Sequence, residues 1–516
     1  MIERTVFMKN TYFSVLFSFF ILLTFSAVLS AAEEPYRIAL FKDGGVSDKT
    51  CASVSKVVEN DPAFQIEIVD AQQIRDGILE EGAYDIVLLP GGLAYKQIDA
   101  LQPEGMKKIK DFVKSGKGYV GICAGAYVPV KQDFLNAEFK SPIWWRGRGV
   151  VKIEFSEFGK QIVGEDFQGQ QDVFYANGPI VHVNVDPCKP QCHVLAWFRT
   201  EMAKGKCVPG IQIDSPAIIL SAYGKGLVAT FSPHLESEPY LYEPILKVLH
   251  HVGKNARMEK TGAEISAETG SEDTFSDAER TRMVEYMRTM AEVTWVPKVD
   301  ITWFDSDAGV IYRAGETYRG IPYTQFDRRT SLESFKEALQ DEDGKPVYVG
   351  PAESDEYRGM DGSAACSYAW RHVIPNFPVL KTWHMEPGAV CLVDPKTGFP
   401  EPVLTKIGDY KWTDFHDSKA VIAENGEDVI TECYRQLKPG DGIVKRPYGQ
   451  VRLVSRLDAE NQKVYIIEQC GLTPEGQLRN DHQSWRVEYE CSFRDLLDEG
   501  YLPIRPSKKV FLDGEN

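Results

Sequence analysis

The chain has 516 residues, 43% apolar and 26% charged, and its acidic residues outnumber Lys and Arg by 75 to 58. This composition is typical of an ordered protein rather than a disordered or fibrous one. Because domains usually contain about 100–200 residues, the length predicts two or three of them. A net charge of −17 lacks the basic face that neutralises phosphates, so nucleic acid is not expected as a partner.

The first 32 residues have the pattern of a secretory signal peptide. Arg4 and Lys9 precede an apolar run over residues 12–29, and small residues follow up to Ala32. This order predicts cleavage near Ala32 and a periplasmic or secreted protein. The alternative is an uncleaved membrane anchor, because the run approaches spanning length. No later segment is apolar enough to span a bilayer, so no stable membrane span is expected after cleavage.

Ten cysteines in a chain of this length are too sparse for a disulfide scaffold. Cys188 and Cys192 flank a Lys-Pro-Gln segment. In an exported chain this spacing favours a local disulfide over a metal pair, because no second pair stands at zinc-finger spacing. We therefore assign neither a metal nor any other cofactor.

Short β-branched runs alternate with helical patterns before residue 254. Alternation of this kind, with glycine-rich turns after the strands, predicts an α/β fold in which helices cover both faces of a doubly wound parallel sheet. The polar residues 254–275 have no apolar periodicity and are predicted to form a linker. Strands are expected at 37–41, 65–69, 85–89, 119–122 and 227–231, and helices at 48–59 and 104–115.

The remainder, residues 276–506, has a different organisation. Ser276–Trp295 has the pattern of a capped amphipathic helix. Mixed helix and strand with many turns follow it, which predicts a second domain of the α+β class.

The strongest chemical signal is the run Gly121-Ile122-Cys123-Ala124-Gly125, which follows an apolar strand and opens a predicted helix. A nucleophile between two such glycines is typical of an elbow between strand and helix. The electropositive helix N-terminus lowers the pKa of a cysteine placed there and favours its thiolate. Backbone N–H groups of Gly91, Gly92 and Ala124 are candidate donors to a developing oxyanion.

A thiolate of this kind also needs a proton shuttle. His234 follows the predicted strand at 227–231, where it can act as the base while Glu236 orients it. Alone, Cys123 is equally compatible with a buried inert cysteine, and His234 with a surface histidine. Together they stand at the carboxyl ends of predicted strands, the edge where open α/β sheets bind ligands.

The stretch 36–253 resembles the flavodoxin-like fold of the class I glutamine amidotransferases, and more specifically the amino-terminal domain of biotin–protein ligases. The resemblance implies a Cys123 nucleophile, a His234 base and a Glu236 orienter, with Gly91 and Gly92 near the oxyanion. Leu235 and Tyr127 stand where amidotransferases have proline and glutamine, so glutamine is not singled out as the substrate. The motifs that carry the resemblance are LLPGG (88–92), GICAGAY (121–127), FYANGP (174–179) and FSPHLE (231–236).

Biotin ligation itself is not expected. The run Arg146-Gly147-Arg148-Gly149 is similar to the glycine–arginine loop of biotin ligases, but no ligase catalytic domain follows it. Export would also remove the protein from ATP and from the synthetase that receives ammonia in amidotransfer. The remaining functions are hydrolysis of an amide or peptide bond, or binding of such a group.

The second half resembles the NlpC/P60-like cysteine hydrolases, which cut peptides of bacterial cell walls. In that family a cysteine opens a helix and a histidine stands on the following strand. Gly362 takes the place of the cysteine and Gln450 that of the histidine, which implies a degenerate site that binds wall peptides without cutting them. The motifs are YRGIPY (318–323), GMDGS (359–363), LKPGD (437–441) and GYLPIR (500–505).

Cys366 is an alternative nucleophile in this half. It follows Gly362 by one helical turn, and a displacement of about 5.4 Å is too large for unchanged catalytic geometry. A core cysteine on an amphipathic helix is the competing interpretation. The sequence does not rank a base for Cys366 among His372, His384, His416 and His482.

Two functions therefore remain open. The first is an exported cysteine-dependent hydrolase that acts on a small amide or peptide, with peptidoglycan-derived peptides as a candidate substrate. The second is a non-catalytic protein that binds such ligands through two degenerate hydrolase-like domains. The sequence makes no prediction about the oligomeric state.

Overall fold

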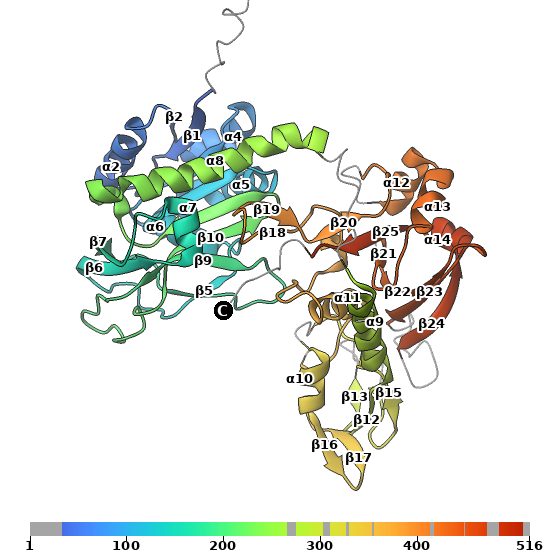
Figure 1. Cartoon of the computed structure of the whole chain (residues 1–516). Helices are drawn as coiled ribbons and strands as arrows, with labels where there is room; N and C mark the ends of the chain where they lie inside the picture. Colours follow the sequence, from blue (N-terminus) through green and yellow to red (C-terminus); the bar gives the residue numbers. More distant parts are fainter. Residues whose placement is uncertain are drawn as a thin grey trace, which may run out of the picture.

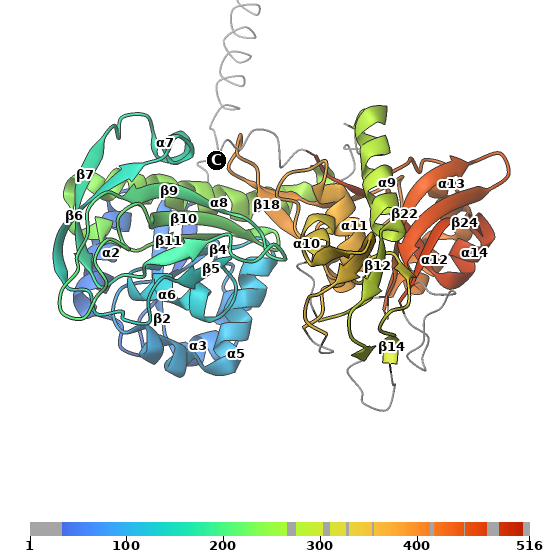
Figure 2. The same ribbon diagram turned by 90° about the horizontal axis from the view of Figure 1, so that it is seen from below.

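The computed structural model describes most of the chain after the predicted signal segment, which itself lies outside the described residues. Two units are visible side by side in Figures 1 and 2, the first built on β1–β11 and the second on β20–β25. Within the described part, no helix combines the length and apolarity needed to cross a membrane. The described ranges are 34–265, 275–302, 310–326, 330–352, 356–412, 417–447, 449–471 and 484–508.

The first unit contains a nine-stranded sheet in the order β2-β1-β3-β4-β11-β10-β9-β6-β7. Strands β2 to β11 of this order run parallel, and every later pairing is antiparallel. The predicted parallel sheet is therefore correct for five strands and wrong for four. In sheet order the bounds are Phe64–Val69, Tyr36–Phe41, Ile86–Leu89, Gly118–Ile122, Gly226–Phe231, Pro216–Tyr223, Cys192–Phe198, Arg148–Phe155 and Gln170–Ala176.

Helices cover both faces of this sheet, as predicted. In β1, Ile38 and Leu40 face the core under α2 and α8, whereas Ala39 and Phe41 face the core under α3, α5 and α6. Burial on both faces explains why strands such as β3, β4 and β11 are continuously apolar. The bounds are α2 (Asp48–Glu59), α3 (Ala71–Arg75), α4 (Ile78–Glu81), α5 (Ala94–Lys114), α6 (Ala124–Lys131), α7 (Glu157–Val163) and α8 (Tyr242–Ile265); β5 (Ala137–Phe139) and β8 (Val181–Val183) form a separate antiparallel pair.

The predicted linker at 254–275 is wrong in its first half, because α8 continues to Ile265. Its polar side chains contact residues just before strands β3 and β4. Asn255 donates to the carbonyl of Gly116 at 3.0 Å, and Arg257 pairs with the buried Asp85 at 3.0 Å. These positions contribute no apolar stripe, so periodicity alone did not reveal the helix. Residues 266–274 of the predicted linker lie outside the described residues.

The second unit is built on a six-stranded antiparallel sheet in the order β20-β25-β21-β22-β23-β24. Helices α9 and α11 pack on one face, and α12, α13 and α14 on the other. The helix predicted at 276–295 corresponds to α9, which Ser276 caps through a capping box with Glu279. The sheet strands are Leu404–Lys406, Tyr501–Pro506, Gly442–Lys445, Val451–Asp458, Lys463–Gln469 and Trp485–Ser492; the helices are Asp277–Glu292, Gly362–Arg371, Ser418–Asn425, Glu427–Tyr434 and Phe493–Glu499.

Smaller elements complete this unit. A four-stranded sheet has the order β15-β12-β17-β16, and β13 pairs with β14. Helix α10 precedes β16, and the 3₁₀ helix η4 follows α11. Their bounds are β12 (Thr294–Pro297), β13 (Ile301–Thr302), β14 (Val310–Tyr312), β15 (Tyr318–Arg319), α10 (Leu332–Glu337), β16 (Leu339–Glu342), β17 (Lys345–Tyr348) and η4 (Thr382–His384).

A hairpin of the second half joins the two units. Strands β18 (Cys391–Val393) and β19 (Pro400–Pro402) pair with each other, and Cys391 and Val393 belong to the hydrophobic core of the first unit. At the tip, the Phe399 ring stacks on His251 at 4.3 Å, and the carbonyl of Gly398 lies 2.6 Å from His251 Nε2. The units are therefore packed together and not only tethered.

The expected disulfide between Cys188 and Cys192 does not form, because all ten cysteines are free. The two side chains face different cores. Cys192, the first residue of β9, is buried in a core of the first unit, whereas Cys188 packs against the core of the second. Close spacing in the sequence therefore does not bring these thiols together.

Candidate active site

Cys123 occupies a sharp turn between β4 and α6. Its backbone has φ 51° and ψ −99°, a strained conformation for a residue with a side chain. The Cys123 N–H donates to the carbonyl of Phe231 at 2.8 Å, so the turn is fixed to the end of β11. A Cβ added at Gly125 would lie 1.9 Å from the carbonyl oxygen of Leu89, which explains the glycine. This is the elbow geometry that the motif predicted.

His234 and Glu236 form a buried pair directly after β11. His234 Nδ1 lies 2.6 Å from Glu236 Oε1, and the two residues are 5% and 1% exposed. The His234 N–H donates to the carbonyl of Phe174 in β7 at 2.8 Å, which fixes the backbone. Glu236 therefore holds the imidazole by Nδ1 and leaves Nε2 for the reacting groups, as an orienting carboxylate does.

The electrostatics of the pair favour an imidazolium. Burial opposes the charged form, but the charges of Cys123 and Glu236, together with their hydrogen-bonding interactions with the ring, outweigh burial and raise the pKa of His234 to about 10. Among the described residues, His234 Nε2 and Glu236 Oε2 are buried without a hydrogen-bond partner. Cys123 is therefore close enough to act on His234 through its charge, while Nε2 remains open for a proton transfer.

The Pro90-Gly91-Gly92 turn borders the same site. A Cβ at Gly91 would lie 3.0 Å from His234 Cε1, so the imidazole packs directly on this glycine. The Gly91 carbonyl accepts hydrogen bonds from the Ser47 N–H at 2.9 Å and the Thr50 hydroxyl at 2.8 Å. In the described part of the chain, no acceptor is found for the N–H of Gly92, or for that of Ala124 in the first turn of α6. These two N–H groups can donate hydrogen bonds to an oxyanion.

Strand β7 contributes contacts to which sequence reasoning assigned no role. The Cys123 Sγ lies 3.5 Å from the carbonyl of Ala176, and the Tyr127 hydroxyl donates to the carbonyl of Asn177 at 2.9 Å. Burial and the charge of Cys123 raise the pKa of Tyr127, which keeps its hydroxyl protonated. The motif at 174–179 was the available signal, but only the fold brings it beside the elbow.

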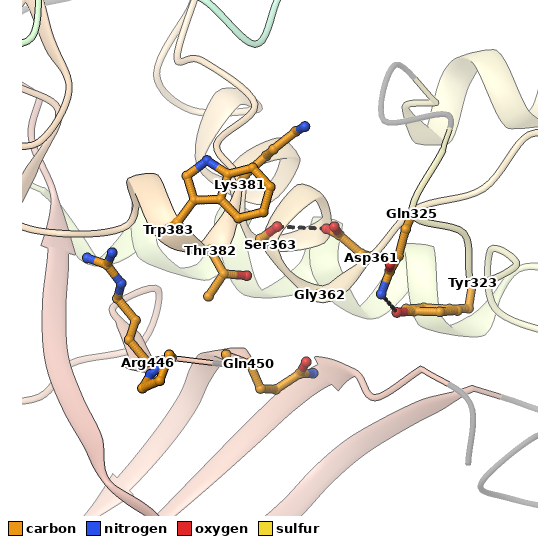
Figure 3. A pocket seen from close by; sticks show the side chains of 12 residues that line it. Tyr323, Gln325, Asp361, Gly362, Ser363, Lys381, Thr382, Trp383, Arg446 and Gln450 are labelled. Atoms are coloured by element: carbon orange, nitrogen blue, oxygen red, sulfur yellow. Dashed lines mark hydrogen bonds between the residues drawn. The ribbon is translucent and has the colours of Figure 1, made fainter. Parts of the chain in front are cut away.

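The predicted degenerate site lies at the start of α11. Gly362 is the first residue of that helix, and Asp361 caps it by accepting from the Ala364 N–H at 2.7 Å. A Cβ at Gly362 would lie 2.9 Å from Gln450 Nε2, so the structure brings these two predicted residues into contact. They line a cavity of about 620 Å³ (Figure 3).

Cys366, the alternative nucleophile, does not line this cavity. It is fully buried, and burial together with the charges of Glu468 and Asp361 raises its pKa well above the ordinary value. Of its candidate bases, His372 stacks on Tyr286 at 4.3 Å, and His384 lies beside Trp383. His416 and His482 lie outside the described residues. These features are those of a core cysteine.

Comparisons with known proteins found a family match in the first unit. Residues 37–140 match the family described as "Biotin-protein ligase, N terminal". That match includes the Cys123 elbow and ends before His234. Among solved structures, a glutamine amidotransferase from Thermotoga maritima has 16% identity and a TM-score of 0.28, covering 46% of this chain and 87% of that one.

PurLQS from Thermotoga maritima also has 16% identity, with a TM-score of 0.31 and coverage of 42% of this chain and 99% of that one. The search of curated proteins gave no match. The first unit is thus an α/β structure with a mixed sheet, and it is similar to biotin–protein ligase amino-terminal domains over residues 37–140.

Proposed function

We propose that the first unit hydrolyses amide or peptide bonds with Cys123 as the nucleophile. The observation that carries the proposal is the buried His234–Glu236 pair, bonded at 2.6 Å beside a cysteine held at a strained elbow. Backbone strain of this kind is maintained where the surrounding structure fixes a reactive group. A buried carboxylate that holds a histidine beside a thiol is the arrangement that nucleophilic catalysis requires.

The reaction would proceed in two steps. The Cys123 thiolate attacks the carbonyl carbon, and N–H groups of Gly92 and Ala124 stabilise the oxyanion. The His234 imidazolium gives its proton to the leaving nitrogen as the C–N bond breaks, which leaves a thioester. Water then attacks the thioester while His234 takes its proton, and the acid and the free thiolate are released.

The proposal extends to location and substrate. The pattern of the first 32 residues favours export, and the motifs of the second unit are similar to those of NlpC/P60-like hydrolases. We therefore favour a periplasmic or secreted enzyme that acts on cell-wall peptides, which the second unit binds without cutting. A protein that only binds such peptides through both units is the competing function.

Site-resolved alkylation of the folded chain with iodoacetamide at about pH 6 tests the proposal. An ordinary thiol is almost wholly protonated at that pH, so Cys123 should react at least tenfold faster than the half-buried Cys188 and Cys470. His234→Gln should remove most of that advantage because it removes the positive partner of the thiolate. Equal labelling of the three cysteines would favour the binding protein.

Activity is then measured as release of amine from a panel of short peptides and primary amides. Wild-type protein should release amine from at least one of them, and Cys123→Ala should abolish the release. Circular dichroism of the variant provides the folding control. Release that persists in Cys123→Ala would assign the chemistry to another residue.

A further inference from the structure

The cavity in the second unit has the properties of a ligand site. It is formed by the start of α11, the segment that contains η4, and the turn between β21 and β22. Figure 3 shows Trp383 and Arg446 on one side, Tyr323, Gln325 and Asp361 on the other, and Gln450 across from the start of α11. Its volume of about 620 Å³ is in the range of pockets that bind small molecules or short peptides.

Gln450 makes this cavity a binding site rather than a catalytic one. Its Nε2 donates to the carbonyl of Gln469 at 2.6 Å and to Glu468 Oε2 at 3.2 Å, so the amide is held in one orientation. It occupies the space next to Gly362 that a larger side chain would need. The Ser363 hydroxyl donates to Asp361 at 2.7 Å as part of the helix cap. The described lining contains no cysteine or histidine.

Three polar groups of the lining have unused bonding capacity. Within the described residues, no acid pairs with Lys381, no donor reaches Gln450 Oε1, and the Thr382 hydroxyl makes no hydrogen bond. The Lys381 ammonium lies 4.9 Å from the centre of the Trp383 ring, which is 60% exposed at the rim. A ligand that offers an anion and N–H donors would satisfy these groups together.

The charges define the orientation of such a ligand. Arg446 is buried and pairs with Glu386 at 2.5 Å, so Lys381 is the cation available to a ligand anion. Asp361 lies across the cavity from Trp383 and Arg446 and repels a second anion there (Figure 3). We propose that the cavity binds a short peptide by its free carboxylate, with the carboxylate on Lys381 and a backbone N–H donating to Gln450 Oε1.

This proposal rests on the binding role proposed above for the second unit, but it does not depend on catalysis at Cys123. Calorimetry with the full chain carrying Cys123→Ala measures binding without any cleavage by the first unit. The probes are the tripeptide Ala-Ala-Ala and its carboxyl-terminal amide, which differ only in the carboxylate. The acid should bind at least tenfold more tightly than the amide, because the amide offers no charge to Lys381.

The decisive variant is Lys381→Met, which keeps most of the side-chain stem and removes the charge. It should weaken binding of the acid about tenfold and leave binding of the amide unchanged. Lys336→Met, at an exposed position of α10, is the matched control and should have no effect. Both positions are outside the core, so folding is retained.

Several results would overturn the proposal. These are no binding of the acid, equal affinity for acid and amide, or an unchanged affinity in Lys381→Met. Inorganic phosphate that displaces the tripeptide at equal concentration would mean that the site binds small anions and not peptide ends. None of these results bears on the reactivity of Cys123, so hydrolysis by the first unit and binding by this cavity can fail separately. Absence of peptide binding would also remove the binding role proposed for the second unit.

Discussion

At the scale of single residues, the first unit combines a cysteine, a histidine and a carboxylate that lie 113 positions or less apart in sequence. Their convergence was predictable because parallel strands end at the same edge of a sheet, and the residues after β4 and β11 must meet there. The pKa of His234 was not predictable. It depends on burial and on two neighbouring charges that only the folded chain places around the ring.

Glu236→Gln should lower the pKa of His234 from about 10 toward neutrality. The raised value means that the ring is protonated below about pH 10, so loss of the negative neighbour allows burial to favour the neutral form. NMR titration of the His234 ring protons measures the change. Cys123→Ala should shift the pKa in the same direction, because the thiolate is the other charge that raises it.

Glu238→Gln is the matched control, since this carboxylate lies two residues further along the chain and makes no bond to His234. It should leave the titration unchanged. An unaltered pKa of His234 in Glu236→Gln would show that the Glu236 carboxylate does not stabilise the imidazolium in solution.

The residues around the cavity of the second unit were only partly predictable from the sequence. The motifs placed Gly362 and Gln450 at a common site, and the two are in contact. The sequence did not reveal that Gln450 is fixed by Glu468, or that Lys381 completes the lining. Those residues come from segments with no recognisable motif, and only tertiary packing makes them neighbours.

At the scale of elements, the positions of the five parallel strands in the first unit were predictable. Strands β3, β4 and β11 are buried throughout and form continuous apolar runs, whereas the edge strand β2 mixes polar and apolar residues. Strands predicted at 37–41 and 65–69 differ from β1 and β2 by one residue at one end. Strand direction was not encoded in the same way. Both β10 and β11 are apolar and almost fully buried, although β11 runs parallel to β4 and β10 runs antiparallel to β11.

A buried ion network joins three elements of the second unit. Asp441 accepts from Arg505 at 2.7 and 2.9 Å and from Arg280 at 3.1 Å, and its side chain is fully buried. It thereby ties the turn before β21 to β25 and α9. The motifs at 437–441 and 500–505 thus stabilise the fold of the second unit, whether or not the unit has catalytic activity.

Asp441→Asn should destabilise the chain by about 3–5 kcal/mol, because two buried guanidinium groups lose their common counter-charge. Urea denaturation followed by circular dichroism measures the loss. Asp498→Asn removes an exposed partner of Arg494 and should leave the free energy of unfolding almost unchanged, because water already screens that pair. Equal effects of the two substitutions would contradict the structural role of Asp441.

At the scale of the whole molecule, the hairpin β18–β19 makes the two units interdependent. Its strand β18 completes the core of the first unit, and two histidines of that unit face it. Burial lowers the pKa of His193 to about 4, against the opposing effects of the Val393 backbone and Asp394. Burial also lowers the pKa of His251, and the nearby Lys254 adds to this effect. Both rings are therefore neutral at the interface near pH 7.

Acidification should weaken this interface. A histidine whose folded pKa lies below its unfolded value of about 6.5 gains its proton only on unfolding. Its contribution is complete above pH 6.5 and is lost as the pH falls toward 4. The loss for His193 amounts to at most about 3 kcal/mol. The free energy of unfolding, measured at several pH values across this range, should therefore fall more steeply in wild-type protein than in His193→Gln.

Limited proteolysis at pH 7 and pH 4.5 gives a second measurement of the same interface. The hairpin at 391–402 should become a cleavage site at the lower pH in wild-type protein. If the free energy of unfolding falls equally with pH in wild-type protein and in His193→Gln, this histidine is not buried in solution.

The sequence by itself determined the α/β character of the first unit, the elbow at Cys123 and the pairing of His234 with Glu236. These features depend on local apolar runs, glycines and spacing, which are properties of the chain read in order. Tertiary structure alone decided the antiparallel half of the sheet, the extension of α8, the free state of Cys188 and Cys192 and the lining of the second cavity. Each depends on contacts between segments that are distant in sequence, and local residue patterns do not determine the free energy of such contacts.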